Sequence, residues 1–464
     1  TTTSLRPKGL RATIGLVVLT AVAVVSIVVR PPMAVRVYLL AHPGAVLAPY
    51  VARGQTWLTM ATSAPVWRAE AAAEHPATEH RVLPTDGIVV LVVVDALRAD
   101  LIASEAHADR LPNLHAMRHA GVWVEEARTT APATIVALTS MFSGRYFSEI
   151  AWTTGFRIDE LPWPHADTTP RLPEVLSAAG VRTTVIHGVE WLAQDTGVIG
   201  RFDDNTRLVA TEREAGLFYV ESSRLVDATL ERLRPAPDGP QFFYLHLLEG
   251  HAPYESGNES TPPFERYLGD LALVDAQIGR LRETLATPAL AQRALLVVTA
   301  DHGEAFGEHG ANFHSTTLYE EMVRVPLLFE GRALEPRVVR GPVTLLDLAP
   351  TILDLFRSAA PASFSHGATL VPMIAQGAPA RPRPLLIDSG RHQRALVFPD
   401  GFKVIEDRRY GTVELFDLRA DPGERRNLVD DLPDEASARL GALQSFFAAH
   451  ERKAPGYATP VRLP

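Results

Sequence analysis

The chain has 464 residues, of which 46% are hydrophobic and 21% are charged, and its formal net charge is −9. This balance excludes a disordered or fibrous protein and predicts one large domain with smaller additions. The negative net charge gives no basis for binding nucleic acid, which requires clustered positive charge. The sequence has no cysteine, which excludes disulfides, thiolate metal ligands and cysteine nucleophiles.

The N-terminal segment combines basic residues with a long apolar run. Arg6, Lys8 and Arg11 precede residues 12–29, a stretch without a charged side chain. As a helix this run would rise about 27 Å, close to the roughly 30 Å hydrocarbon core of a bilayer. We therefore predict that residues 1–30 anchor the protein in a membrane, with the rest on the outer (periplasmic or extracellular) side. A cleaved signal peptide is the alternative.

Beyond a connector over residues 31–84, apolar runs alternate with amphipathic helices. Continuous runs of branched residues are typical of strands that are buried on both faces of a parallel sheet. They cover residues 87–94, 181–186, 242–247, 294–299 and 325–329. The clearest helix has apolar residues at steps of three and four from Leu268 to Leu285. This alternation predicts an α/β sandwich with a mainly parallel central sheet over residues 85–378.

The remaining residues, 379–464, have the pattern of a small subdomain made of strands and turns. Residues 395–398 and 402–405 predict a hairpin, because the Pro-Asp-Gly sequence of residues 399–401 between them favours a turn. The pattern over residues 432–450 predicts a helix that closes the subdomain.

Acidic residues follow two of the predicted buried strands. Asp95 comes directly after the first run, and Asp301 with His302 follows the run over residues 294–299. Because the carboxyl ends of parallel strands meet at one edge of a sheet, we expect these side chains to lie close together. Two carboxylates and an imidazole suit a divalent cation, and zinc, manganese and calcium are each compatible. For Asp95 alone, the alternative is a helix N-cap.

Between these acids, the segment TTAPATIVALTSMFSGRY predicts a helix that begins near Pro132 and ends at Ser143-Gly144. Thr134 would lie in the first turn, close to free amide groups and the positive end of the helix dipole. This position favours an alkoxide or a bound oxyanion, and a bound metal is one way to activate a weak hydroxyl nucleophile. The alternative is that Thr134 only caps the helix.

Six segments of the chain carry distinctive patterns in a fixed order. They are VVVDALRAD, LPEVLSAAGVRTTVI, FYLHLLEGHAPY, TADHGEAFGEHG, LYEEMVRVPLLF and LFDLRADPGERRNL. From about residue 86 to 430, this series resembles the landmarks of the sulfatase family, within the alkaline phosphatase superfamily. The resemblance implies a three-layer α/β/α sandwich with a small antiparallel C-terminal subdomain. It also implies metal-assisted attack on a sulfate or phosphate ester.

The resemblance also implies roles for single residues. The implied metal ligands are Asp95, Asp301, His302 and the nucleophile Thr134. Counting ten residues back from Gly144 places the family's nucleophile at Thr134. Arg98 and Asp100 match a polar pair after the first strand, and Arg98 would stabilise negative charge on the ester group during attack.

Two departures from the family pattern concern this site. Sulfatases have a cysteine or serine at the nucleophile position, which is oxidised to formylglycine, and threonine cannot give that aldehyde. Thr134, Val136 and Leu138 stand where the family has a Cys-x-Pro-x-Arg pattern, and TIVALTSMFS resembles the threonine-nucleophile segment of phosphoethanolamine transferases. Ala96 stands where many sulfatases have another ligating aspartate, which favours a single metal ion.

Histidines complete the predicted site. By resemblance, His251 and His314 match residues that contact the transferred group or the leaving oxygen. His246, at the end of a predicted strand, is a further candidate, and an ordinary packing role is the alternative for each histidine. Imidazole suits proton donation near neutral pH. Glu304 and His309 lie in the same loop as His314, and we give them less weight.

These observations predict a metal-dependent hydrolase of phosphate or sulfate esters, with phosphate esters favoured. The substrate would be a small ester, a lipid or a glycan. Three alternatives stay open: a sulfatase, a membrane-linked transferase of the phosphoethanolamine or phosphoglycerol type, and a non-catalytic protein that binds a metal. The sequence does not indicate an oligomeric state.

Overall fold

The computed structural model describes residues 76–154, 162–211, 219–364, 366–454 and 457. These residues belong to two units, one formed by residues 76–391 and the described residues from 450 onward, the other by residues 392–449. The membrane anchor proposed for residues 1–30 lies outside the described part of the chain and stays a prediction. Within the described part, every helix is too short or too polar to cross a bilayer.

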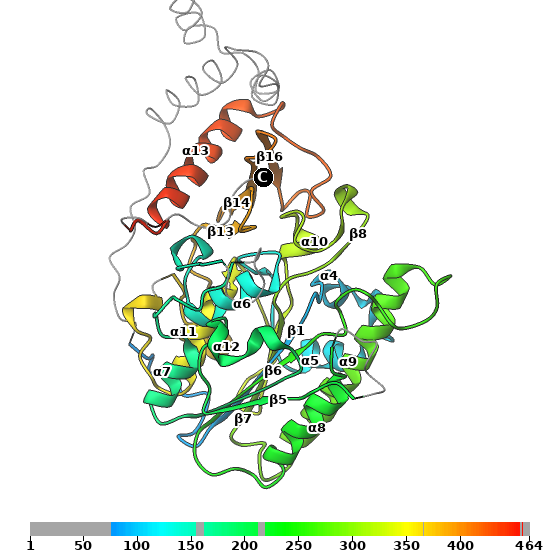
Figure 1. Cartoon of the computed structure of the whole chain (residues 1–464), viewed down its shortest axis with the longest axis vertical. Coiled ribbons are helices and arrows are strands. Elements are labelled where there is room, and N and C mark those ends of the chain that lie inside the picture. The colour runs from blue at the N-terminus through cyan, green and yellow to red at the C-terminus, as the bar shows by residue number, and fades with distance from the viewer. Residues whose placement is uncertain (1–75, 155–161, 212–218, 365, 455–456, 458–464) are drawn as a thin grey trace, which may run out of the picture. The chain divides into compact units, whose positions relative to one another are not determined.

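A sheet of eight strands lies at the centre of the larger unit as described, in the order β11-β2-β10-β7-β1-β6-β4-β5 (Figure 1). The neighbouring parallel strands are β7 (Ala294–Ala300), β1 (Ile88–Val94), β6 (Gln241–Leu247), β4 (Arg182–His187) and β5 (Asp204–Arg207). The other three are β10 (Leu327–Glu330), β2 (Val122–Val124) and β11 (Arg337–Val339). The mainly parallel sheet expected from the sequence is confirmed.

The register of the central strands fixes the position of the acidic residues. Every residue of β1 is buried, as expected for a strand covered on both faces. Val94, the last residue of β1, pairs with Leu247 of β6 and with Ala300 of β7. Asp95 follows Val94 and Asp301 follows Ala300, so the two acids lie side by side at the same edge of the sheet.

Helices cover both faces of the sheet in Figure 1. One group comprises α5 (Pro112–Ala120), α8 (Ser222–Leu233) and α9 (Pro263–Leu285), with the short α4 (Asp100–Ala103) beside α5. The other comprises α6 (Thr134–Ser143), α7 (Leu172–Ala178), α11 (Leu348–Leu355) and α12 (Val371–Gln376). The remaining short elements are α10 (Glu320–Val323), β3 (Ala127–Arg128), β8 (Ala305–Phe306), β9 (Asn312–Phe313), β12 (Val343–Thr344) and β13 (Leu385–Asp388). The expected α/β/α layering is confirmed.

The sequence patterns did not predict some of the strands, and they predicted the wrong direction for β10. The run over residues 325–329 forms β10, which begins after Pro326 and is antiparallel to both neighbours. β5 has the sequence DNTR and is an edge strand of the sheet. Its residues are only partly buried or exposed, so it does not need an apolar sequence. Strands of three or four residues such as β2 and β11 are too short to show a period.

The smaller unit is an antiparallel meander with one helix. β14 (Gln393–Val397), β15 (Phe402–Asp407) and β16 (Thr412–Asp417) are joined by tight turns, and α13 (Pro433–Ala449) packs on them. Gly401, with φ of 93°, allows the first turn. Lys403 and Glu424 form a fully buried ion pair at 2.9 Å. The predicted hairpin and closing helix are therefore present.

In the larger unit, a buried carboxyl group joins the end of β6 to the beginning of α8. The Ser222 amide donates a hydrogen bond of 2.5 Å to Oε1 of Glu249, while Oε2 has no hydrogen-bond partner among the described residues. Burial raises the pKa of Glu249 to about 7, and the hydrogen bonds from Ser222 oppose this rise only in part. The carboxyl group therefore keeps its proton in the folded state at mildly acidic pH.

This raised pKa makes the free energy of unfolding depend on pH. The folded state holds the Glu249 proton to a higher pH than the unfolded state, so stability falls as pH rises from about 4.5 to 7. Glu249→Gln should remove this loss, on the order of 3 kcal/mol, so the variant gains stability relative to the wild type between pH 4 and pH 8. Urea unfolding at both pH values measures the gain, with the exposed Glu283→Gln as control. Parallel pH curves for Glu249→Gln and wild type would contradict the assignment.

Candidate active site

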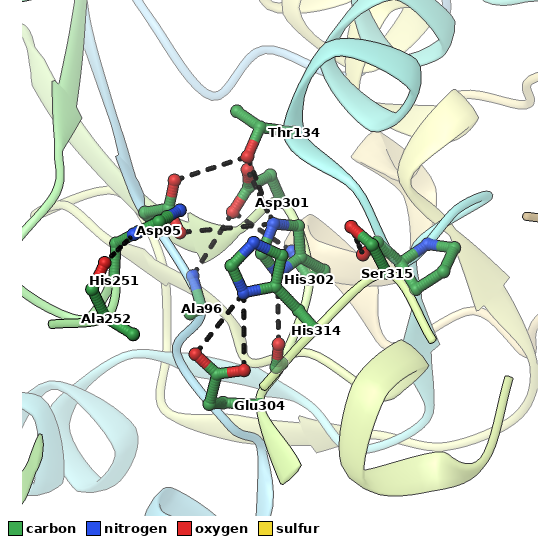
Figure 2. A network of polar contacts seen from close by, with 12 residues as sticks. Asp95, Ala96, Thr134, His251, Ala252, Asp301, His302, Glu304, His314 and Ser315 are labelled. Atoms are coloured by element: carbon green, nitrogen blue, oxygen red, sulfur yellow. Dashed lines mark hydrogen bonds and ion pairs between the residues drawn. The ribbon is translucent and has the colours of Figure 1, made fainter. Parts of the chain in front are cut away.

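Asp301 is oriented by the backbone around it. Its Oδ1 accepts hydrogen bonds from the amide of His302 at 3.0 Å and from the amide of Ala96 at 3.4 Å. Its other oxygen, Oδ2, is buried and has no hydrogen-bond partner within the described residues. Because one oxygen is held by two amides, the second is directed toward Asp95 and His302 (Figure 2).

His302 is held in one tautomer by its neighbour. Its Nδ1 lies 2.9 Å from the carbonyl oxygen of Gly303, which can only accept, so Nδ1 carries the proton. The Nε2 atom therefore presents its lone pair, 3.5 Å from Oδ2 of Asp301 and 3.9 Å from Oδ1 of Asp95. A histidine fixed through its other nitrogen in this way is typical of metal ligands.

Thr134 is the first residue of α6, and its side chain points toward the same group. Its Oγ1 lies 3.3 Å from Oδ2 of Asp95 and 3.1 Å from Nε2 of His302, and the residue is 7% exposed. Ala133 takes the N-cap position with extended backbone angles. The Thr134 hydroxyl thus contacts the acidic cluster, whereas the sequence also allowed a role as a simple helix cap.

The donor atoms fit a divalent cation. Ligating atoms of Asp95, Asp301 and His302 all lie within 4.8 Å of one another, and all three residues are buried. Oδ1 of Asp95 and Oδ2 of Asp301 lack hydrogen-bond partners in the described part of the chain. Two buried, unpaired carboxylate oxygens beside an imidazole lone pair are electrostatically unfavourable unless a cation lies between them. These residues, with Thr134, could hold such an ion.

Electrostatics keep Asp95 ionised. Burial by itself would raise the pKa of Asp95, but the neighbouring His246, His302 and His251 outweigh it and hold the pKa below its ordinary value. His246 contributes from β6, where Nε2 lies 3.6 Å from Oδ2 of Asp95. The Tyr244 hydroxyl lies 3.0 Å from Nδ1 of His246. His246 is therefore a buried neighbour of Asp95, and the catalytic role suggested for it stays a prediction.

His314 and His251 lie beside the cluster (Figure 2). The ring of His314 stacks on that of His302 at 4.5 Å and meets the ring of His251 at 4.7 Å. Nδ1 of His314 lies 3.3 Å from both carboxylate oxygens of Glu304. Burial would lower the pKa of His314, but Glu304, Asp95 and Asp301 outweigh it and raise this pKa.

Arg98 is held by three polar groups around it. Its guanidinium group binds Asp100 at 2.8 Å, Glu308 at 2.7 Å and the carbonyl oxygen of Glu304 at 3.1 Å. These contacts commit Arg98 to holding the loop that carries Glu304 and His314. The direct role toward the ester group stays a prediction, and the observed contacts support a positioning role.

The sequence analysis gave little weight to Glu304 and did not consider Tyr254 or Ser315. Glu304 is fully buried and accepts a hydrogen bond from the Tyr254 hydroxyl at 3.0 Å. Ser315 binds the carbonyl oxygen of Pro132 through its amide at 2.9 Å, which ties the His314 loop to the segment before Thr134. The only sequence signal was that Glu304 lies in an Asp-His-Gly-Glu loop after a buried strand.

An α/β/α sandwich with this cluster at the carboxyl edge of its parallel strands defines a protein of the alkaline phosphatase type. The fold matches the phosphonate monoester hydrolase from Silicibacter pomeroyi with a TM-score of 0.62 and 19% identity, covering 78% of this chain and 94% of that chain. It also matches a putative sulfatase from Bacteroides thetaiotaomicron with a TM-score of 0.61 and 18% identity, covering 78% and 93%.

The sulfatase family model matches residues 88–358, and the chain belongs to the sulfatase family. An uncharacterized sulfatase of Escherichia coli is 30% identical over 171 residues, which cover 34% of this chain and 32% of that protein. A choline-sulfatase of Rhizobium meliloti is 28% identical over 192 residues, which cover 40% and 36%. The matched segments thus span about a third of the length of these curated relatives.

Proposed function

We propose that the chain is a metal-dependent ester hydrolase in which Thr134 is the nucleophile, with phosphate esters as the favoured substrates. The observation that carries this proposal is the position of Oγ1 of Thr134, 3.3 Å from Asp95 and 3.1 Å from His302. A hydroxyl in the first turn of a helix beside unpaired carboxylate oxygens has the neighbours that a metal-activated nucleophile requires.

The proposed reaction has two displacements. In the first, Thr134 loses its proton to solvent, a bond forms between Oγ1 and phosphorus, and the bond from phosphorus to the leaving oxygen breaks. His314 donates a proton to that oxygen. In the second, water attacks phosphorus and gives a proton back to His314, while the bond from phosphorus to Oγ1 breaks and Thr134 takes a proton from solvent. A divalent cation bound by Asp95, Asp301 and His302 would lower the pKa of the hydroxyl and offset charge on the ester oxygens.

The residue at position 134 supports phosphate over sulfate. The formylglycine of sulfatases is formed from cysteine or serine, and the threonine side chain cannot be converted to that aldehyde. Sulfate esters remain the second candidate, because the curated relatives that match this chain include a choline-sulfatase. Transfer of the phosphoryl-linked group to a lipid or glycan hydroxyl, in place of water, would use the same first step.

A substrate panel tests the proposal. Chromogenic phosphate monoesters, phosphate diesters, phosphonate esters and sulfate esters are assayed with zinc, manganese and calcium in turn. We expect the highest kcat/KM with a phosphate ester. A quench during turnover, followed by mass spectrometry, should find a phosphorylated peptide containing Thr134. Faster sulfate than phosphate turnover would favour the second candidate, and an acceptor-dependent rate would indicate a transferase.

The contact between Glu304 and His314 gives a sharper prediction about the leaving group. Glu304→Gln weakens the orientation of His314, so hydrolysis of alkyl esters should fall about 10²-fold. Nitrophenyl esters should lose far less, because their leaving oxygen needs little proton donation. Glu283→Gln is the control, since Glu283 is an exposed acid on α9 outside this loop. Equal losses for both classes of ester would contradict proton donation by His314.

A further inference from the structure

A second group of ligating side chains lies outside the candidate active site. Glu105 belongs to the 3₁₀ turn η1 (Glu105–His107), and His115 and His119 are one turn apart on α5. One ligating atom from each lies within 4.8 Å of the others. Because residues at i and i+4 share one face of a helix, both imidazoles of α5 face Glu105.

His115 is the most informative member of this group. It is 3% exposed, and its Nε2 lies 3.1 Å from the carbonyl oxygen of Leu101. A carbonyl oxygen can only accept, so Nε2 carries a proton. The other nitrogen, Nδ1, is buried without a hydrogen-bond partner in the described residues and lies 3.4 Å from Oε2 of Glu105. A buried lone pair facing a carboxylate oxygen is unfavourable unless a metal ion or a proton lies between them.

The separations also suit a metal ion. His119 contributes Nε2, which lies 3.1 Å from Oε1 of Glu105. Ligands at about 2.0–2.1 Å from a tetrahedral zinc ion lie about 3.3 Å from one another, close to the 3.4 Å and 3.1 Å found here. The hydrogen bond from His115 to Leu101 is the outer contact that orients a metal-bound histidine.

We propose that Glu105, His115 and His119 form a second metal site, which takes zinc or a similar imidazole-binding divalent ion, with water as the remaining ligand. The side chains of Glu105 and His119 are 59% and 60% exposed, so an ion can enter from solvent. Arg118 also contacts Glu105 and must share this carboxylate with the ion or move away. The bound ion would link η1 to α5.

Zinc titration of the full chain, stripped of metal and followed by calorimetry, tests this site. We expect two zinc equivalents for wild type and one for His119→Ala, an exposed position whose substitution does not threaten folding. Glu105→Gln should weaken the second equivalent at least tenfold. Asp301→Asn serves as the matched variant of the active site and should keep the peripheral ion. X-ray absorption of zinc in Asp301→Asn should show two imidazole ligands.

The outcomes separate this site from the proposed function. If His119→Ala and wild type bind the same number of zinc ions with the same affinity, the second site is wrong and the group is an ion-pair cluster with protonated histidines. If Asp301→Asn loses no zinc while His119→Ala loses one equivalent, the active-site proposal fails and the peripheral site stands.

Discussion

Thr134→Ala should lower kcat/KM for the best phosphate ester by at least about a thousandfold, equivalent to about 4 kcal/mol of transition-state stabilisation. The substitution removes the one hydroxyl that lies within hydrogen-bond distance of both Asp95 and His302 in the described structure. The folded state should lose little, because the change removes only a small buried group. Steady-state kinetics, together with urea unfolding, measure both effects.

Two control variants separate chemistry from packing. Thr134→Ser retains a hydroxyl at the same position and should keep measurable turnover, whereas Thr134→Ala should not. Thr139→Ala removes a buried hydroxyl from the same helix that donates to the Ile135 carbonyl oxygen at 2.6 Å. It should leave kcat/KM within a few-fold of wild type. If Thr134→Ala retained full activity on phosphate and sulfate esters alike, another group would have to be the nucleophile.

Asp301→Asn should abolish metal-dependent activity and should reduce the stabilisation that metal gives to the folded state. Removing metal from wild type with a chelator should lower activity at least about a hundredfold, and adding the correct ion should restore it. A metal at a hundred times its Kd stabilises the folded state by about 2.7 kcal/mol. The melting temperature of wild type should therefore rise more when metal is added than that of Asp301→Asn, which keeps only the proposed peripheral site.

Without metal, Asp301→Asn should have the opposite effect on the melting temperature. Asparagine at position 301 can still accept the amide hydrogen bonds of His302 and Ala96 through its carbonyl oxygen. It replaces the unpaired Oδ2 by a neutral group, which removes charge repulsion with Asp95. Metal-free Asp301→Asn should therefore melt at a higher temperature than metal-free wild type. A lower melting temperature would show that no ion is needed to offset the charges of the cluster.

Apolar runs allowed the buried strands to be predicted, because a strand covered on both faces must be apolar at every position. Parallel pairing then brought Asp95 and Asp301 to one edge, so their proximity followed from the pattern alone. The same reasoning failed for β5, whose Asp-Asn-Thr-Arg sequence has no apolar signal. It also failed for the direction of β10, which depends on the path of the chain and not on composition.

Side-chain partners were predicted less well than strands. Arg98 binds Glu308, a residue 210 positions later, and this choice depends on how two loops meet after folding. Glu304 holds His314 through a carboxylate that resembles any other loop acid in the sequence. The resemblance placed Thr134 and His302, but their mutual distance of 3.1 Å required the three-dimensional structure.

The amides of Ala96 and His302 have a consequence for sequence change. Every residue except proline supplies a peptide N–H. The orientation of the Asp301 carboxylate therefore does not depend on which side chains are present at positions 96 and 302. Ala96 has a φ of 59°, a left-handed backbone conformation that is unfavourable for an alanine. The residue beside the first acid can therefore change without redirecting the second acid.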